Sequence, residues 1–201
     1  MKVKYITIER EYGSGGTKIA QELASRCGIA CYGREILEMA ARNQRVSVED
    51  VERYEETASN SLIYSFLVMG NAQNGSFSDI MPMESRLYVE EHEVIKRMAR
   101  KGPAVFVGHC AAEALDDETG VLRVFIHAEE WFKRKRAVEH YGIAERDAEA
   151  VCRRFNKRRA NYYSFNTSKE WNDPANYDIV LNSSTLGIDG CVKVLLALME
   201  K

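Results

Sequence analysis

The chain has 201 residues, of which 45% are hydrophobic and 29% charged, and its net charge is −2. This length predicts a single domain over residues 1–201 with a sizeable core. No run approaches the roughly 20 apolar residues that a membrane span requires, so we expect a cytoplasmic protein without a membrane partner. The five cysteines include no C-x-x-C pair, which favours reduced thiols over disulfides or a metal site.

Positive charge is concentrated between Lys133 and Arg159, a segment with ten Lys or Arg against four Asp or Glu. It therefore carries +6, and the rest of the chain carries −8. Such a segment indicates an anionic partner, either nucleotide phosphates or nucleic acid. A solvated helical face is the alternative.

The first half of the chain alternates strand and helix patterns. The expected elements, in chain order, are a strand over 2–8, a helix that ends at Gly28, a short strand over 29–32, a helix over 35–42 and another helix from Ser47. The first helix carries Ile19, Leu23 and Ala24 on one face, and a glycine after the last apolar residue typically ends a helix. The periodicity weakens over 59–79, and residues 70–76 predict an exposed loop.

The second half continues this alternation. Its expected elements are a long helix over 84–101, strands over 104–107 and 121–126, two basic helices, a strand over 177–181 and an amphipathic helix over 188–199. Strands alternating with crossover helices predict an α/β fold in three layers, with about five parallel strands flanked by helices. Ligands bind such folds at the edge where the strands end, so the loops at that edge are candidate sites.

The glycine-rich turn after the first strand is a candidate phosphate site. Glycines let the backbone approach a ligand closely, and the N–H groups at the start of the next helix attract negative charge. The residues expected to contact phosphate are Arg10, Gly13, Ser14, Gly15, Gly16, Thr17 and Lys18. The turn lacks the GK[ST] ending of most P-loop enzymes. A tight strand-to-helix turn without a ligand is the alternative.

Five motifs, in order along the chain, resemble the cytidylate kinase-like family of P-loop proteins: ITIEREYGSGGTKIA, CYGREIL, VFVGHC, NKRRANYY and KEWNDPANYDIVLNSSTLGIDG. The resemblance implies the P-loop NTPase-like fold of nucleoside monophosphate kinases, with a basic helical lid over about 128–165 and a helical acceptor-side region over about 35–101. It also implies transfer of the γ-phosphoryl group of ATP, with Mg²⁺, to CMP or a similar small acceptor.

Phosphoryl transfer depends on positioning and on positive charge around the moving group. Arg159 resembles the arginine of the lid's D-x-x-R pattern, with Asn156 where an aspartate is common. Arg154 and Lys133 are further catalytic candidates, although each could be a solvated helix charge.

The glycine turn departs from the pattern of true cytidylate kinases, and the resemblance implies that the members of this divergent family share the departure. Gly16 stands where the phosphate-binding lysine belongs, and Lys18 stands where the magnesium-binding Ser or Thr belongs. Thr17 is therefore the candidate metal ligand, and Arg10 is a candidate source of charge at the beginning of the turn.

The acceptor side has two expected contacts. His109 stands where related proteins carry an arginine that faces the monophosphate, and no acidic residue adjoins it in the sequence. Arg34 begins a helix at the sheet edge, which makes it a plausible phosphate contact. A structural histidine and an ordinary helix-terminal charge are the alternatives.

The leading hypothesis is an enzyme, a nucleotide-binding phosphotransferase. The alternative from another class is a catalytically degenerate nucleotide-binding protein that acts as a sensor or interaction module, which Gly16, Lys18 and His109 favour. Nucleic-acid binding ranks last, because the basic segment matches no recognised reader motif. The sequence leaves the acceptor and the oligomeric state open.

Overall fold

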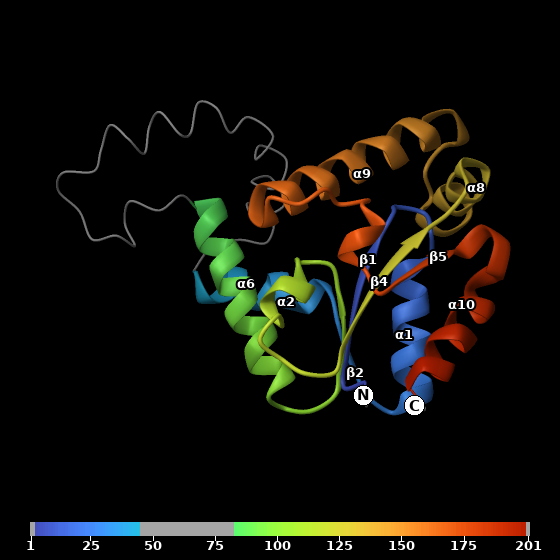
Figure 1. The fold of residues 1–201 in the computed structure, drawn as a ribbon. Coiled ribbons are helices and arrows are strands. Elements are labelled where there is room, and N and C mark those ends of the chain that lie inside the picture. Colours follow the sequence, from blue (N-terminus) through green and yellow to red (C-terminus); the bar gives the residue numbers. More distant parts are fainter. Residues whose placement is uncertain (1–2, 45–82, 200–201) are drawn as a thin grey trace.

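The computed structural model describes residues 3–44 and 83–199. The predicted helix from Ser47 and the predicted loop over 70–76 lie outside these residues. The described strands form one parallel sheet in the order β2-β3-β1-β4-β5 (Figure 1). The strands are β1 (Tyr5–Arg10), β2 (Ala30–Tyr32), β3 (Ala104–Val107), β4 (Val121–His127) and β5 (Ile179–Asn182).

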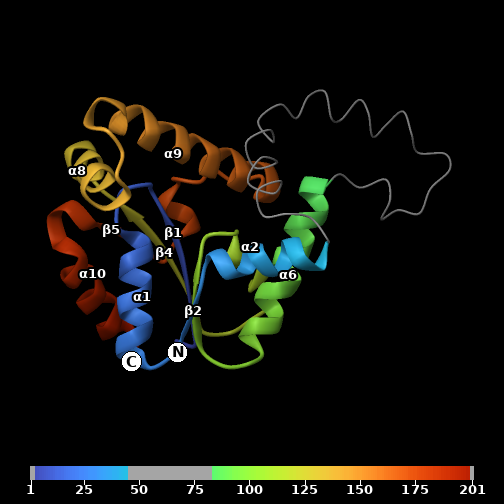
Figure 2. The same cartoon turned by 180° about the vertical axis from the view of Figure 1, so that it is seen from behind.

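Helices cover both faces of the sheet, as the alternation of patterns predicted (Figure 2). They are α1 (Gly16–Cys27), α2 (Arg34–Asn43), α6 (Met83–Ala99), α7 (Ala111–Ala114), α8 (Glu130–Tyr141), α9 (Glu145–Thr167) and α10 (Ser183–Met199). The three-layer α/β fold with about five parallel strands is therefore confirmed. None of the helices in residues 3–44 and 83–199 is long and apolar enough to cross a membrane.

Most element boundaries differ from the predicted ones by one to three residues, and two differences have a structural cause that can be named. β1 runs two residues beyond the predicted end because Glu9 and Arg10 continue the ladder beside Phe125 and Ile126 of β4. The last helix begins at Ser183 and contains a non-helical residue, Gly187, at φ 68°. The longer ladder carries Arg10 to the carboxyl edge of the sheet.

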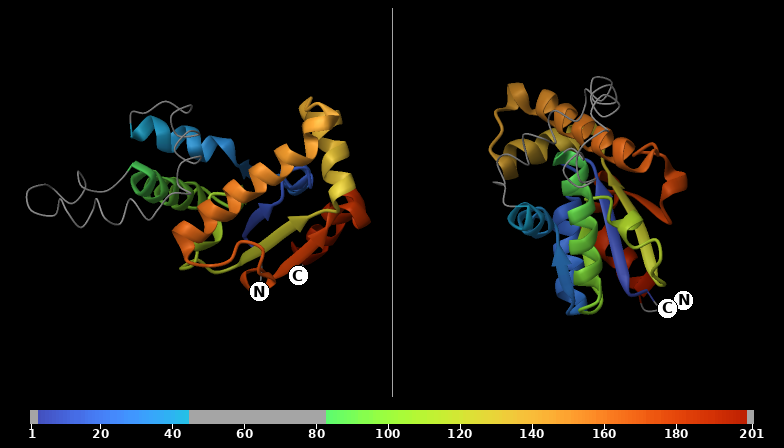
Figure 3. Two further views of the ribbon diagram at one scale, coloured as in Figure 1. Left: turned by 90° about the horizontal axis from the view of Figure 1, so that it is seen from above. Right: turned by 90° about the vertical axis from the view of Figure 1, so that its left-hand side faces the viewer.

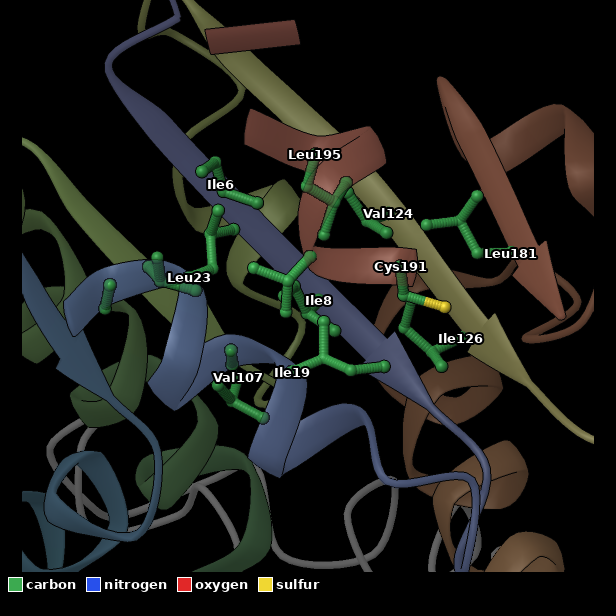
Figure 4. Close-up of a cluster of buried hydrophobic side chains, with 14 residues drawn as sticks. Ile6, Ile8, Ile19, Leu23, Val107, Val124, Ile126, Leu181, Cys191 and Leu195 are labelled. Atoms are coloured by element: carbon green, nitrogen blue, oxygen red, sulfur yellow. The ribbon is translucent and has the colours of Figure 1, made fainter. Parts of the chain in front are cut away.

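The core on one face of the sheet lies between β1, α1 and α10 (Figure 4). Ile6 and Ile8 are fully buried there against Ile19 and Leu23 of α1 and Leu195 of α10. Successive residues of a strand point to opposite faces, so Thr7 and Glu9 project to the other side. This alternation aims the Glu9 carboxylate away from the main core.

α9 lies over the carboxyl end of the sheet, on the side away from the chain termini (Figures 1 and 3). Two contacts hold it there. The backbone N–H of Tyr12 donates to Oδ1 of Asn156 at 2.6 Å, and Nη1 of Arg159 donates to the carbonyl oxygen of Arg10 at 2.8 Å. The basic helical segment therefore covers the loop that follows β1.

Candidate functional site

The turn between β1 and α1 is closed around its glycines. Gly13 and Gly15 have φ of 81° and 80°, which glycine adopts without steric cost. A Cβ at Gly13 would lie 2.7 Å from the carbonyl oxygen of Lys133, and one at Gly16 would lie 2.5 Å from Cβ of Arg10. Close packing therefore requires glycine at positions 13 and 16, and the backbone conformation favours glycine at positions 13 and 15.

Hydrogen bonds fix the same turn. Oγ of Ser14 donates to the carbonyl oxygen of Glu11 at 2.8 Å, and Oγ of Ser183 donates to the carbonyl oxygen of Ser14 at 2.6 Å. α1 begins directly afterwards at Gly16, and the first N–H groups of a helix form a site of positive potential. The turn thus has the preformed geometry expected of an anion cradle.

Lys18 and Thr17 lie on the exposed surface of α1. Nζ of Lys18 is 3.4 Å from Oε1 of Glu22, one helical turn further along α1. The ammonium group is thus directed along the helix and away from the glycine turn. Arg136 of α8 is one of the cationic residues that do lie beside the turn, because a Cβ at Gly15 would be 3.3 Å from Nε of Arg136.

A cavity of about 590 Å³ opens between the end of β1, α2, the turn after β3, and α9. Its lining residues are Glu9, Arg10, Arg34, Leu37, His109, Cys110, Arg154, Phe155, Arg158, Arg159, Tyr162 and Tyr163. Among these residues, which all belong to the described part of the chain, five are arginines and one is a carboxylate, so their summed charge is strongly positive. The structure thus gathers the predicted residues Arg10, Arg34, His109, Arg154 and Arg159 around one space, while Lys133, Thr17 and Lys18 lie outside its lining.

Aromatic rings support the arginines of α9. Tyr12 and Phe155 stack with ring centroids 4.5 Å apart. The guanidinium carbon of Arg159 lies 5.7 Å from the Tyr12 ring centroid, and that of Arg158 lies 5.4 Å from the Phe155 centroid. Cations within about 6 Å of an aromatic face are attracted to it. These rings hold the guanidinium groups at the cavity wall before any ligand binds.

Arg159 is the most strongly perturbed of these cations. Burial, and secondly the charge of Arg10, lower the pKa of Arg159 to about 9. The group remains cationic at neutral pH, but two like charges face each other in a partly desolvated space. A bound anion between them would relieve this repulsion, so the arrangement favours a phosphate or carboxylate ligand.

Lys133 was predicted as a catalytic residue, but the structure places its side chain among carboxylates outside the cavity lining. Its side chain is 5% exposed, and Nζ lies 3.0 Å from Oε2 of Glu11 and 2.6 Å from Oε1 of Glu130. Burial by itself lowers the pKa of Lys133, but its hydrogen bonds to Glu130 and Glu11 outweigh this and raise that pKa. The charge is thus used to join α8 to the β1–α1 turn.

A Lys133→Met substitution tests this structural use. It leaves the Glu11 carboxylate partly buried without its cation, which is expected to lower the free energy of unfolding by about 2 kcal/mol. Lys135→Met is the matched control, since Lys135 is exposed and only 3.9 Å from Glu139, and exposed pairs contribute roughly 0–1 kcal/mol. Urea unfolding of the three proteins measures both values, and equal losses in the two variants would contradict this role.

His109 has an acidic neighbour, contrary to what its sequence surroundings indicated. Nδ1 of His109 lies 3.0 Å from Oε1 of Glu91, a residue of α6 that is 1% exposed. The hydroxyl group of Tyr162 on α9 donates to the other oxygen of Glu91. Sequence reasoning missed Glu91 because eighteen residues and the whole of β3 separate it from His109.

Glu9 was also missed as a residue of the site. It lines the cavity, and its Oε2 accepts a hydrogen bond of 3.0 Å from Nε1 of Trp171. Trp171 is 4% exposed and packs edge-on against Phe125, so its ring is part of the packing around the site. The strand alternation that buries Ile6 and Ile8 would have placed Glu9 on the opposite face.

Within residues 3–44 and 83–199, no group of three or more His, Cys, Asp or Glu side chains could hold a metal ion. The glycine turn offers backbone N–H groups, and Thr17 supplies one hydroxyl group at the beginning of α1. This donor set fits a phosphate group, or a cation carried by a phosphate group, better than a resident metal ion.

A sequence profile of the cytidylate kinase-like family matches residues 5–185. No curated protein matches the chain. Among solved structures, an uncharacterized protein from Eubacterium ventriosum ATCC 27560 is 23% identical, with a TM-score of 0.71 over 100% of this chain and 99% of that one.

Two kinases have the same fold at lower identity. A shikimate kinase from Bacteroides thetaiotaomicron is 11% identical, with a TM-score of 0.55 over 98% of both chains. A gluconokinase from Sinorhizobium meliloti 1021 is 13% identical, with a TM-score of 0.54 over 100% of this chain and 96% of that one. At these identities the likeness establishes the fold.

Proposed function

The chain belongs to the cytidylate kinase-like family, and from this premise we propose that it is a phosphotransferase that moves the γ-phosphoryl group of ATP to a small anionic acceptor. The acceptor is a nucleoside monophosphate of the CMP type or a related small molecule. Catalysis of this kind is mostly positioning and electrostatic stabilisation, so the site needs cations more than it needs a nucleophile.

The observation that carries this proposal is the cavity with five arginines and one carboxylate in its lining. Such a concentration of guanidinium groups around a partly enclosed space attracts anionic ligands, even though Arg34 also pairs with Glu38 at 3.1 Å. Arginine also forms bidentate hydrogen bonds with phosphate and carboxylate groups. We therefore place the anionic acceptor in this cavity, with Arg34 and Arg154 at its exposed side.

The nucleotide would bind at the glycine turn. The N–H groups at the start of α1 and the guanidinium of Arg136 would face its phosphates, and Arg136 would supply the charge that Gly16 lacks. The Thr17 hydroxyl would hold Mg²⁺, which supplies charge neutralisation on the β- and γ-phosphates when it is bound. Arg159 and Arg10 lie between this turn and the cavity, where the transferred group would pass.

A coupled ADP-release assay with Mg²⁺ tests the proposal. CMP, UMP, AMP, dCMP and the anionic alcohols shikimate and gluconate are the acceptors. At least one of them is expected to raise ADP release well above the rate with ATP alone. Saturable ATP binding is expected in calorimetry, and ATP at about 100 times its Kd should raise the free energy of unfolding by about 2.7 kcal/mol.

The second candidate function is nucleotide binding without useful catalysis. The ion pair between Lys18 and Glu22 favours it, because neither residue 16 nor residue 18 then presents a cation to the phosphates. This reading predicts the same ATP binding with no transfer to any acceptor. Absence of ATP binding would reject both readings.

A further inference from the structure

Glu91 is a buried carboxylate in contact with two elements besides its own. It is 1% exposed on α6, and its oxygens accept hydrogen bonds from His109 in the turn after β3 and from Tyr162 on α9. A buried carboxylate is costly unless it is hydrogen-bonded, and here both oxygens are occupied. The pair that it forms with His109 faces the cavity, because His109 and Tyr162 belong to its lining.

The carboxylate determines which imidazole nitrogen carries the proton. A carboxylate can only accept hydrogen bonds, so Nδ1 of His109 is the N–H nitrogen in the 3.0 Å contact with Glu91. In the neutral ring the lone pair then belongs to Nε2. A carboxylate partner favours the protonated imidazole, whereas the arginines that share the cavity lining, above all Arg10 beside Gly108, disfavour it.

The backbone at His109 is held in a conformation that side chains rarely adopt. Gly108, His109 and Cys110 have consecutive φ values of 77°, 59° and 49°. Left-handed conformations cost roughly 1–2 kcal/mol for each residue that has a Cβ. Strain of this kind collects at functional sites, where the surrounding structure maintains it. The positive φ of Gly108 favours glycine, and a Cβ on it would displace the guanidinium tip of Arg10, whose Nη1 lies 2.1 Å from the ideal Cβ position.

Within residues 3–44 and 83–199, few other groups of the cavity lining are suited to accept a proton at neutral pH. The five arginines of β1, α2 and α9 are cations. Glu9 of β1 accepts the indole N–H of Trp171. Burial raises the pKa of the Cys110 thiol well above its usual value, and burial likewise raises the pKa of the Tyr163 hydroxyl. With Glu91 and Tyr162 behind it, His109 is the lining group best suited to act as a base.

Resting on the phosphotransfer proposed above, we infer that His109, positioned by Glu91, takes the proton of a hydroxyl group on the acceptor. The acceptor is thus an anionic alcohol, a small molecule with a carboxylate or phosphate group for the arginines and a hydroxyl group as nucleophile. A phosphate acceptor is already largely ionised at neutral pH, since its second pKa is about 6, and it would need no base.

The acceptor O–H bond breaks, and its proton goes to Nε2 of His109. The acceptor oxygen forms a bond to the γ-phosphorus of the nucleoside triphosphate, and the bond from that phosphorus to the β–γ bridging oxygen breaks. The nucleoside diphosphate leaves with the electron pair of that bond.

His109→Asn is the test variant, because its amide N–H can still donate to Glu91 while the base is removed. With an anionic alcohol such as shikimate, gluconate or glycerate, kcat is expected to fall about 100-fold, since general bases contribute roughly 10²–10⁴. The acidic limb of the pH profile, where protonation of His109 stops wild-type turnover, should disappear. His140→Asn on the exposed surface of α8 is the matched control and should leave kcat and the profile unchanged.

Glu91→Gln tests the positioning residue. It keeps the size of the side chain but removes the charge that supports the imidazole. We expect kcat to fall about 10-fold, as for other carboxylates behind a functional histidine. The acidic limb should move to lower pH, because the pKa of the imidazole falls without its carboxylate. A merely structural carboxylate would change stability and leave the limb in place.

The outcomes separate this inference from the function on which it rests. One result would overturn the inference but support the proposed phosphotransferase function. In that result the wild-type protein phosphorylates a nucleoside monophosphate, and the His109→Asn variant does so with the same rate and the same pH dependence. If no acceptor is phosphorylated, the proposed function fails and the inference with it. Nitrogen-15 NMR gives an independent readout, since a His109 tautomer with the proton on Nε2 would overturn the inference whatever the activity.

Discussion

Replacing Arg159 with alanine is expected to lower kcat/KM of phosphoryl transfer by about 10³-fold, since arginines that stabilise the transferring group are worth roughly 10³–10⁵. Arg159 joins α9 to the end of β1 through its hydrogen bond with the Arg10 carbonyl oxygen, and it lines the acceptor cavity. Its loss therefore removes both a charge at the reacting group and a contact that holds α9. The coupled ADP-release assay measures the change.

Arg153→Ala is the matched control for this prediction. Arg153 lies on the outer surface of α9, where it pairs with Glu149 one turn away, and it takes no part in the cavity lining. We expect near wild-type turnover from it. The Arg159→Ala protein is expected to keep its melting temperature without ligand, because relief of the repulsion with Arg10 offsets the lost hydrogen bond. Equal activity of the two alanine variants would exclude Arg159 from the reaction.

Gly13→Ala is expected to lower the free energy of unfolding by about 3 kcal/mol or more and to abolish ATP binding. The residue has φ of 81°, and its new Cβ would lie 2.7 Å from the carbonyl oxygen of Lys133. Backbone of α8 cannot move aside as the tip of a flexible side chain can, so the turn and α8 must separate. Urea unfolding and calorimetry with ATP measure the two effects.

Gly28→Ala separates backbone conformation from packing. Gly28 has φ of 64°, but no atom lies within 4 Å of its ideal Cβ position. This control is therefore expected to lose only about 1 kcal/mol, the cost of a left-handed alanine, and to bind ATP normally. A Gly13 variant no less stable than the Gly28 variant would show that the turn can open away from α8.

Much of the fold follows from patterns within a few residues of each other. Short β-branched and apolar runs predicted the strands, and Gly28 marks the end of α1 both by sequence and by its left-handed conformation. The short helix α7 and the 3₁₀ turn at Pro174–Asn176 were not predicted, because neither is long enough to show a period. Periodicity and helix-ending glycines are properties of single strands and helices. They therefore predict the elements from which a parallel α/β sheet is built.

The same distinction between local sequence signals and long-range contacts applies to the site. Sequence motifs indicated Arg10, Arg34, His109, Arg154 and Arg159, and the structure brings all five around one cavity, while their roles stay predictions. The sequence also indicated Lys133 and Lys18, which pair with carboxylates and lie outside the cavity lining. A sequence motif indicates that a cationic residue stands at a given position. It does not record which carboxylate lies beside that cation after folding.

The sequence by itself determined the order of strands and helices, the family resemblance and the glycine turn, because propensity, periodicity and glycine conformation act locally. Only the tertiary structure decided which side chains meet. Glu91 reaches His109 across 18 residues, Asn156 reaches Tyr12 across 144, and Arg159 reaches Arg10 across 149. These contacts depend on how α6 and α9 pack against the sheet, and that packing is a property of the whole core rather than of any one segment.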